Sequence, residues 1–181
     1  MKTLIIHAED SSTDFLCPIY QTIKDKTVLR KGLTKNEIAE QIKKHDRVLM
    51  LGHGSPEGLF SVGQFKTNNS LIIDSSIVSL LTEKEENIYI WCHAKEFVER
   101  YNLKGFYTGM FVSEFLEVVY CQLPLVEDNV IVESNDEFSK IVSKYVNDSK
   151  SVLYKKVLEE YQIIANGNLV AAYNIDRIYY Q

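Results

Sequence analysis

The chain has 181 residues, of which 45% are hydrophobic and 25% are charged, and this composition predicts one globular domain spanning residues 1–181. The formal net charge of −5, without a dense run of Lys or Arg, argues against a nucleic-acid or anionic-lipid partner. The apolar runs are too short to cross a bilayer or to form a signal peptide. We therefore expect a cytoplasmic protein with no membrane partner.

Predicted strands and helices alternate through the first part of the chain. Apolar, β-branched runs predict the strands, and apolar residues at helical spacing predict the helices between them. In chain order we expect a strand at Thr3–Ile6, a helix around Phe15–Ile23, a weaker strand at Thr27–Leu29, a helix from Thr34 to about His45 and a strand at Arg47–Leu51. Thr34 and Glu37 match a capping box, which supports the start of the second helix.

The alternation continues after the loop Gly52–Gly58. The pattern predicts an irregular hairpin of Leu59–Gly63 and Leu71–Ile73 joined by a polar turn at Lys66–Ser70, a short helix from Asp74 to Leu81, a strand at Asn87–Trp91 and a helix at Lys95–Tyr101. Strands that alternate with helices indicate a mostly parallel sheet with helices on both faces. The fold class is therefore an α/β three-layer sandwich.

The last part of the chain reads as mainly helical. A loop from Gly105 leads into an apolar helix that includes Glu117, and Pro124 stops it. Apolar spacing predicts further helices at Asp136–Val146 and Ser149–Ile164, and Asp176–Tyr180 is a candidate for a late strand.

Two predicted central strands each end in a side chain with catalytic chemistry. His53 stands between two glycines after the first of these strands, and Cys92 directly follows the second. Parallel strands end at the same edge of a sheet, so neighbouring strands would bring the imidazole and the thiol together. Gly52 and Gly54 suit an unusual loop conformation, and exposed amides beside the thiol suit a tetrahedral oxyanion.

These residues resemble the caspase-like cysteine peptidases, which include caspases, gingipains, legumain, separase and CHAT-type peptidases. Val48–Gly54 resembles the family's strand ending in His-Gly, and Ile88–Cys92 resembles its later strand ending in the catalytic Cys. The resemblance implies a caspase-like fold with Cys92 as the nucleophile, His53 as the proton donor to the leaving amine, and the amides of Gly54 and Cys92 as the oxyanion hole. Trp91 departs from the small residue that usually precedes the family's Cys.

Several other polar residues have both a functional and a structural interpretation. Four carboxylates are possible pocket acids that recognise a basic group: Glu57, Asp74, Glu114 and Glu117. An ordinary carboxylate on the solvent-exposed face of a helix or loop is the more common structural explanation. The segment after the first strand, with His7, Glu9 and Asp10, can line the same sheet edge or form a simple polar loop.

The three cysteines are odd in number and lack CxxC spacing, which argues against a disulfide framework or a structural zinc site. We expect Cys17 and Cys121 to be packing residues.

The sequence thus favours a thiol-dependent hydrolase, a cysteine peptidase that acts on an amide in a peptide or protein substrate and needs no cofactor or metal. A catalytically inactive caspase-like domain used for binding or signalling is the alternative. A chelatase-like protein is a weaker alternative, since Leu51–Ser55 resembles a metal-chelating segment, and a metal set of His53, Cys92 and His93 has suitable ligand types. Self-association is left open.

Overall fold

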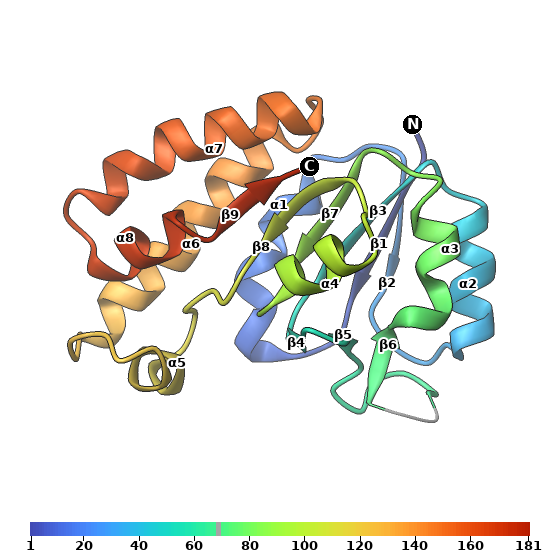
Figure 1. Ribbon diagram of the computed structural model, residues 1–181, viewed down its shortest axis with the longest axis horizontal. Coiled ribbons are helices and arrows are strands. Elements are labelled where there is room, and N and C mark those ends of the chain that lie inside the picture. The colour runs from blue at the N-terminus through green and yellow to red at the C-terminus, as the bar shows by residue number, and fades with distance from the viewer. Residues whose placement is uncertain (68–69) are drawn as a thin grey trace.

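The computed structural model describes residues 1–67 and 70–181. A six-stranded sheet with the order β2-β1-β3-β7-β8-β9 lies between two layers of helices (Figure 1). Its strands are β1 Thr3–His7, β2 Lys26–Leu29, β3 Arg47–Leu51, β7 Asn87–Ile90, β8 Gly105–Thr108 and β9 Ile178–Tyr180. The first five of these strands are parallel, and β9 pairs antiparallel with β8. The predicted three-layer α/β sandwich with a mostly parallel sheet is confirmed.

Alternate residues of the central strands face the two helical layers. Leu4 and Ile6 of β1 belong to one buried cluster, whereas Ile5 between them belongs to the other. The uninterrupted apolar run of β3 follows from this arrangement, because a strand covered on both faces buries every side chain.

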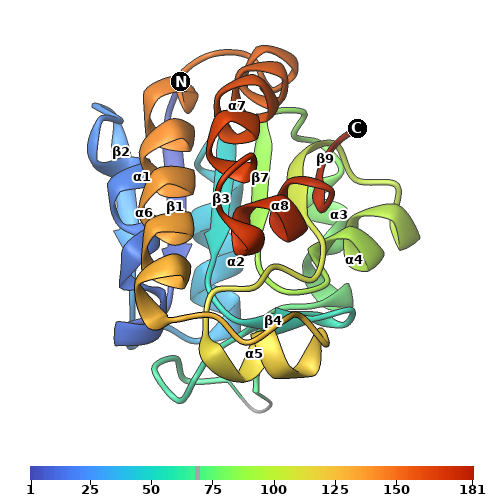
Figure 2. The same cartoon turned by 90° about the vertical axis from the view of Figure 1, so that its left-hand side faces the viewer.

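One layer contains α2 Lys35–Lys43, α3 Val78–Leu81 and α4 Ala94–Arg100, and the other contains α1 Pro18–Gln21, α6 Asp128–Tyr145, α7 Lys150–Ala165 and α8 Leu169–Ile175. Figure 2 shows α6 and α7 in front of the sheet. Two 3-10 helices precede α1 and α3, at Ser11–Leu16 and Ser75–Ile77.

A small antiparallel sheet consists of β4 Gly54–Ser55, β5 Gly58–Phe60 and β6 Leu71–Ile73. It lies with α5 Phe115–Tyr120 at one end of the large sheet in both views (Figures 1 and 2). The predicted hairpin of the second and third of these strands is confirmed. Its predicted turn, Lys66–Ser70, lies in part outside the described residues.

The sequence-based prediction was wrong in three places along the second half. Gly105–Thr108 is strand β8 and not a loop, α6 begins at Asp128 and not at Asp136, and α8 was not predicted. The strand was missed because it has four residues and begins with a glycine. A Cβ on Gly105 would lie 2.1 Å from the Asn87 carbonyl oxygen, so the glycine permits the close approach of β8 to β7.

Among the described residues, the helices lack the combination of length and apolar character that a bilayer span requires.

Candidate functional site at the carboxyl edge of the sheet

The order of the parallel strands fixes where a site is expected. The chain leaves β1 toward β2 on one side and leaves β3 toward β7 on the other, so the direction of winding reverses between β1 and β3. Ligand sites of doubly wound sheets lie at such a switch point, beyond the carboxyl ends of the strands. The loops after β1 and β3 meet here, because the Ser12 hydroxyl oxygen lies 2.7 Å from His53 Nε2.

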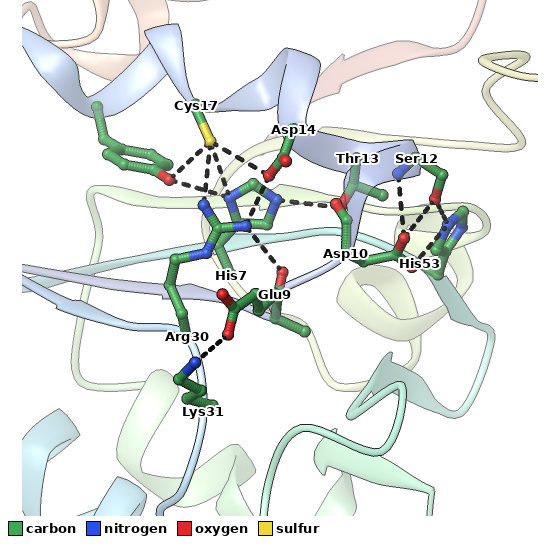
Figure 3. Close-up of polar contacts among 12 residues, drawn as sticks. His7, Glu9, Asp10, Ser12, Thr13, Asp14, Cys17, Arg30, Lys31 and His53 are labelled. Atoms are coloured by element: carbon green, nitrogen blue, oxygen red, sulfur yellow. Dashed lines mark hydrogen bonds and ion pairs between the residues drawn. The ribbon is translucent and has the colours of Figure 1, made fainter.

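His53 is held by polar groups from the loop after β1. The Ser12 hydroxyl donates a hydrogen bond of 3.0 Å to Asp10 Oδ1, and Asp10 Oδ2 lies 3.6 Å from His53 Nε2 (Figure 3). Glu114 Oε1 lies 3.9 Å from the same nitrogen. Because the Ser12 hydroxyl donates its hydrogen bond to Asp10, its oxygen can accept a hydrogen bond from an Nε2–H group of His53. The network therefore favours the tautomer in which Nδ1 is the basic nitrogen.

The conformation of the loop that delivers His53 depends on glycine. Gly52 has φ +135°, a backbone conformation that L side chains rarely adopt. A Cβ on Gly54 would lie 2.1 Å from Cδ1 of Trp91, so this glycine makes room for the indole ring. The Trp91 Nε1–H donates to the Ser55 carbonyl oxygen at 3.1 Å. Trp91, which replaces the small residue found in the peptidases that the sequence resembles, thus packs against Gly54.

Cys92 follows β7, which pairs in parallel with β3, so the condition for bringing the imidazole and the thiol together, that the two strands are neighbours, is met. Its thiol lies 3.3 Å from Glu117 Oε1 and 3.4 Å from the Phe111 carbonyl oxygen, and donates toward both. Burial raises the pKa of the Cys92 thiol well above its usual range, and the Glu117 carboxylate raises that pKa further. In this arrangement Cys92 keeps its proton.

His53 and Cys92 line one pocket at this edge. Its volume is about 20 Å³, little more than one water molecule needs. The loop after β1 supplies Thr13, Phe15 and Leu16 to its wall, and the segment before α5 supplies Phe111 and Ser113. The pocket therefore joins the two predicted catalytic side chains but is narrow.

The predicted pocket acids are in different places. Glu114 lies beside His53, as described above. Glu57 forms an ion pair of 2.9 Å with Arg100 on α4, and Asp74 accepts from the Ser76 amide at a helix start and pairs with Lys35. Glu117 is no substrate acid here, because its carboxylate accepts from the Ser113 and Glu114 amides as well as from Cys92.

The amides predicted to form the oxyanion hole belong to residues at the same edge. Gly54 begins β4, and Cys92 lies two residues after Ile90, the last residue of β7. His93 after the thiol has φ +68° and its ring pairs with Glu96 at 3.2 Å.

Within the described residues, no three His, Cys, Asp or Glu side chains are grouped to hold a metal ion, so the set of His53, Cys92 and His93 is not assembled.

A second polar cluster at this edge was not predicted. It surrounds Cys17, whose sulfur accepts from the Tyr20 hydroxyl at 3.1 Å and from Arg30 Nη1 at 3.3 Å (Figure 3). The Asp14 carboxylate lies 3.7 Å from the sulfur, and His7 Nδ1 lies 4.0 Å from it. Cys17 packs against a core cluster, as predicted, but it also has these polar contacts; Cys121 packs against a smaller apolar cluster.

The ionisation of this second cluster is set by burial. Burial and, to a smaller extent, the nearby Arg30 guanidinium lower the pKa of His7 from 6.5 to about 4, so the ring is neutral at pH 7. Burial also raises the pKa of the Tyr20 phenol, with a smaller contribution from its hydrogen bond to Cys17. The strand-end rule gave two signals for this cluster: His7, already a candidate for this edge, ends β1, and Arg30 directly follows β2.

Comparison with known proteins gives no family assignment. The chain matches no family model, and it has no match among the curated proteins.

Proposed function

We propose that this protein is a thiol-dependent hydrolase of peptide or protein amides, built on a caspase-like version of the three-layer sandwich, with Cys92 as the nucleophile and His53 as the proton carrier. One observation carries the proposal: the two side chains leave the ends of the adjacent strands β3 and β7 and line the same pocket. The sequence resemblance of Val48–Gly54 and Ile88–Cys92 to that peptidase family supports the same roles.

The reaction is an acyl transfer. The Cys92 proton moves to the basic nitrogen of His53, and the sulfur forms a bond to the substrate carbonyl carbon while the π electrons move to oxygen. The amides of Gly54 and Cys92 stabilise that oxyanion. His53 then protonates the leaving amine as the carbon–nitrogen bond breaks, and water cleaves the thioester to release the acid and restore the thiol.

The described arrangement is a resting state of such an enzyme. The Cys92 thiol donates a hydrogen bond to the Glu117 carboxylate, which disfavours the thiolate, and the pocket of about 20 Å³ is too small for a peptide group with its side chains. Phe111 and Ser113 precede α5 and Glu117 lies within it, so all three belong to one segment, residues 111–117. We infer that a substrate displaces this segment, which opens the pocket and removes the carboxylate from the thiol.

A peptide electrophile tests the proposal, because it presents the amide-like group and traps the nucleophile. We would incubate the protein with a library of peptidyl acyloxymethyl ketones and locate the adduct by peptide mass spectrometry. We expect an adduct on Cys92 that His53→Ala slows by about a hundredfold or more, as for loss of a general acid or base. The matched control Cys121→Ala should label as the wild type does. Absence of any Cys92 adduct would favour the inactive binding or signalling domain.

A second candidate is a serine hydrolase, and the contact of 2.7 Å between Ser12 and His53 favours it. Two features weigh against it. The Ser12 proton is directed to Asp10, and Asp10 lies near the same imidazole nitrogen as the serine, so it does not orient the ring from the other side. A fluorophosphonate probe, which reacts with activated serines, distinguishes the two: an adduct on Ser12 supports the serine candidate, and no Ser12 adduct together with Cys92 labelled by the acyloxymethyl ketone supports the thiol.

A further inference from the structure

Helix α5 has an apolar face that is exposed to solvent. Four of its six residues are large hydrophobic side chains with exposed fractions between 44% and 76%, and we call them the α5 patch: Phe115, Leu116, Val119 and Tyr120. Because they are one and four residues apart, their side chains lie on one face of the helix. Of the described helices and strands, no other exposes more than two large hydrophobic side chains. Grouped exposed hydrophobic residues mark interaction sites, whereas scattered ones do not.

The opposite face of α5 attaches the helix to the rest of the protein. Val118 is fully buried and packs in a small apolar cluster with Ile131 of α6 and Val170 of α8. The Glu117 carboxylate accepts from the Ser113 amide at 2.6 Å. The α5 patch therefore faces away from the protein because the helix is held by its other side.

The α5 patch lies in an acidic stretch of the chain. Residues 105–139 contain seven acidic residues and no Lys or Arg, so all 20 basic residues of the chain lie outside this stretch. Glu127, Asp128 and Asp136 of this stretch are exposed, and within the part of the chain that the structure describes none of the three pairs with a Lys or Arg. Their negative charge is therefore not neutralised by the protein itself.

These carboxylates are near the patch in space as well as in sequence. Glu114 directly precedes the patch. Asn135 of α6 donates to the Ser113 carbonyl oxygen at 2.9 Å, which brings the acidic helix α6 beside the start of α5. Both views show the start of α6 next to α5 (Figures 1 and 2). The surface thus combines an apolar face with an acidic border.

We propose that the α5 patch is the docking surface for a basic amphipathic helix of a partner protein, which has apolar residues on one face and Lys or Arg residues beside them. The apolar residues pack on the patch as one helix packs on another, and the cations lie against the carboxylates of α6. The same charges disfavour two other occupants. A second copy of this chain would place one acidic border against another, and an anionic lipid surface would be repelled.

The proposal is independent of the hydrolase proposal, because its test measures binding and not turnover. We would titrate the full chain into three fluorescein-labelled peptides of about 18 residues, or five helical turns, and measure fluorescence anisotropy. The first peptide is an amphipathic helix of Leu and Lys, the second has Glu in place of Lys, and the third has Ser in place of Leu. We expect the Leu and Lys peptide to bind at least about tenfold more tightly than either of the others, because only it matches both features of the surface.

A pair of hydrophobic variants locates the binding site. Leu116→Ser should weaken binding of the Leu and Lys peptide by about tenfold, because one leucine loses its apolar contacts with the peptide. Ile163→Ser on α7 is the matched control, since Ile163 is 69% exposed and Leu116 is 76% exposed, and it should leave the affinity unchanged. Circular dichroism establishes that both variants fold.

A pair of charge variants tests the acidic border. The double variant Glu127→Gln and Asp128→Asn should weaken binding by several-fold at low salt and by less at high salt, because salt screens exposed charges. The double variant Glu83→Gln and Asp176→Asn removes two exposed carboxylates elsewhere and should leave the affinity unchanged.

Four results would overturn the proposal. The first is equal binding of the three peptides, and the second is an equal affinity of the Leu116→Ser and Ile163→Ser variants for the Leu and Lys peptide. The third is a dimer in sedimentation velocity that Leu116→Ser dissociates, which would make a second copy the occupant. The fourth is binding to phosphatidylserine vesicles that Leu116→Ser abolishes, which would make a lipid surface the occupant.

Discussion

Two cysteines lie at the carboxyl edge of this sheet, and each thiol donates toward a carboxylate, Glu117 for Cys92 and Asp14 for Cys17, but only Cys17 also has a cation beside its sulfur. The Cys92 thiol lies 3.3 Å from the Glu117 carboxylate, whereas the Cys17 sulfur lies 3.3 Å from the Arg30 guanidinium. A carboxylate that accepts from a thiol stabilises the protonated form, and a guanidinium that donates to sulfur stabilises the anion. Both thiols lie at this edge of the sheet, Cys92 just after strand β7 and Cys17 at the start of α1, and the groups around each sulfur determine its chemistry.

The two histidines differ in the same way. His7 is fully buried, with the Tyr20 hydroxyl 3.1 Å from Nδ1 and the Thr13 hydroxyl 3.1 Å from Nε2. His53 is partly exposed and lies within 4 Å of two carboxylates. A neutral, enclosed ring suits structure, and a ring that is open to the pocket and near anions suits proton transfer. The comparison favours a structural role for His7 and supports the role of proton carrier that we propose for His53.

The largest effect we expect is from Gly54→Ala, which tests whether the Cys92 region depends on tight packing. The new Cβ would lie 2.1 Å from Trp91 Cδ1 and 2.7 Å from the Gly58 carbonyl oxygen, so backbone or indole has to move. We expect a loss of about 3 kcal/mol in the free energy of unfolding, measured by urea denaturation. Gly167→Ala is the matched control, because its Cβ meets nothing within 4 Å.

Gly54→Ala should leave the rate at which iodoacetamide alkylates Cys17 unchanged. An equal slowing or acceleration at Cys17 and Cys92 in Gly54→Ala would contradict the separation of the two regions.

The buried histidine predicts a pH dependence of stability. His7 has a folded pKa of about 4 and an ordinary pKa of 6.5, so between these values the unfolded chain binds a proton that the folded chain does not. The free energy of unfolding therefore falls as the pH drops from about 6.5 to 4, by about 3 kcal/mol from this residue. We would compare urea denaturation of the wild type and His7→Gln at pH 7 and pH 4.

In that comparison the carboxylates contribute equally to both proteins, and the difference isolates His7. The variant should lose less stability on acidification than the wild type does. If both lose the same amount, the ring is not held neutral by burial, and the assignment of His7 to a closed structural cluster is wrong.

Glu117→Gln tests the origin of the difference between the thiols. The amide keeps an acceptor of the same shape but removes the negative charge, so the Cys92 thiolate becomes less costly. We expect alkylation of Cys92 by iodoacetamide to rise by about tenfold and that of Cys17 to stay unchanged. Glu114→Gln removes a neighbouring carboxylate that faces His53 and serves as the control. An unchanged Cys92 rate would show that burial alone suppresses its reactivity.

Part of this molecule could be predicted from local patterns. The buried strand β3 has the predicted bounds, and the capping box of Thr34 and Glu37 is present at the start of α2. Both signals are contained within a few residues. Strand β8 has no such signal, because its four residues are identified only by their pairing with β7 and β9.

The candidate site also has one part that the sequence predicts and another that it does not. The proximity of His53 and Cys92 followed from two strand ends and a parallel sheet, which are properties of the chain order. The contact of Cys92 with Glu117 joins residues 25 apart, and the contact of Cys17 with Arg30 joins residues 13 apart. Each depends on how an irregular segment folds back on the sheet edge, and no spacing rule describes that.

The smallest effect we expect is from Ser12→Ala, which separates support of His53 from catalysis. The change removes the hydroxyl that bridges Asp10 and His53, with contacts of 3.0 Å and 2.7 Å, and should cost about 1 kcal/mol of unfolding free energy. If Cys92 is the nucleophile, labelling by the peptide electrophile should slow by less than about tenfold, because the imidazole remains and only its orientation loosens.

Ser12→Thr, which keeps the hydroxyl, should restore most of that rate. A complete loss of turnover in Ser12→Ala, with Cys92→Ala still active, would instead make the serine the nucleophile. The outcome also bears on the comparison of the two thiols, because Ser12 and Cys17 belong to one short connection between β1 and α1. An unchanged rate of Cys17 alkylation by iodoacetamide in Ser12→Ala would show that the two clusters act separately although both belong to the same segment.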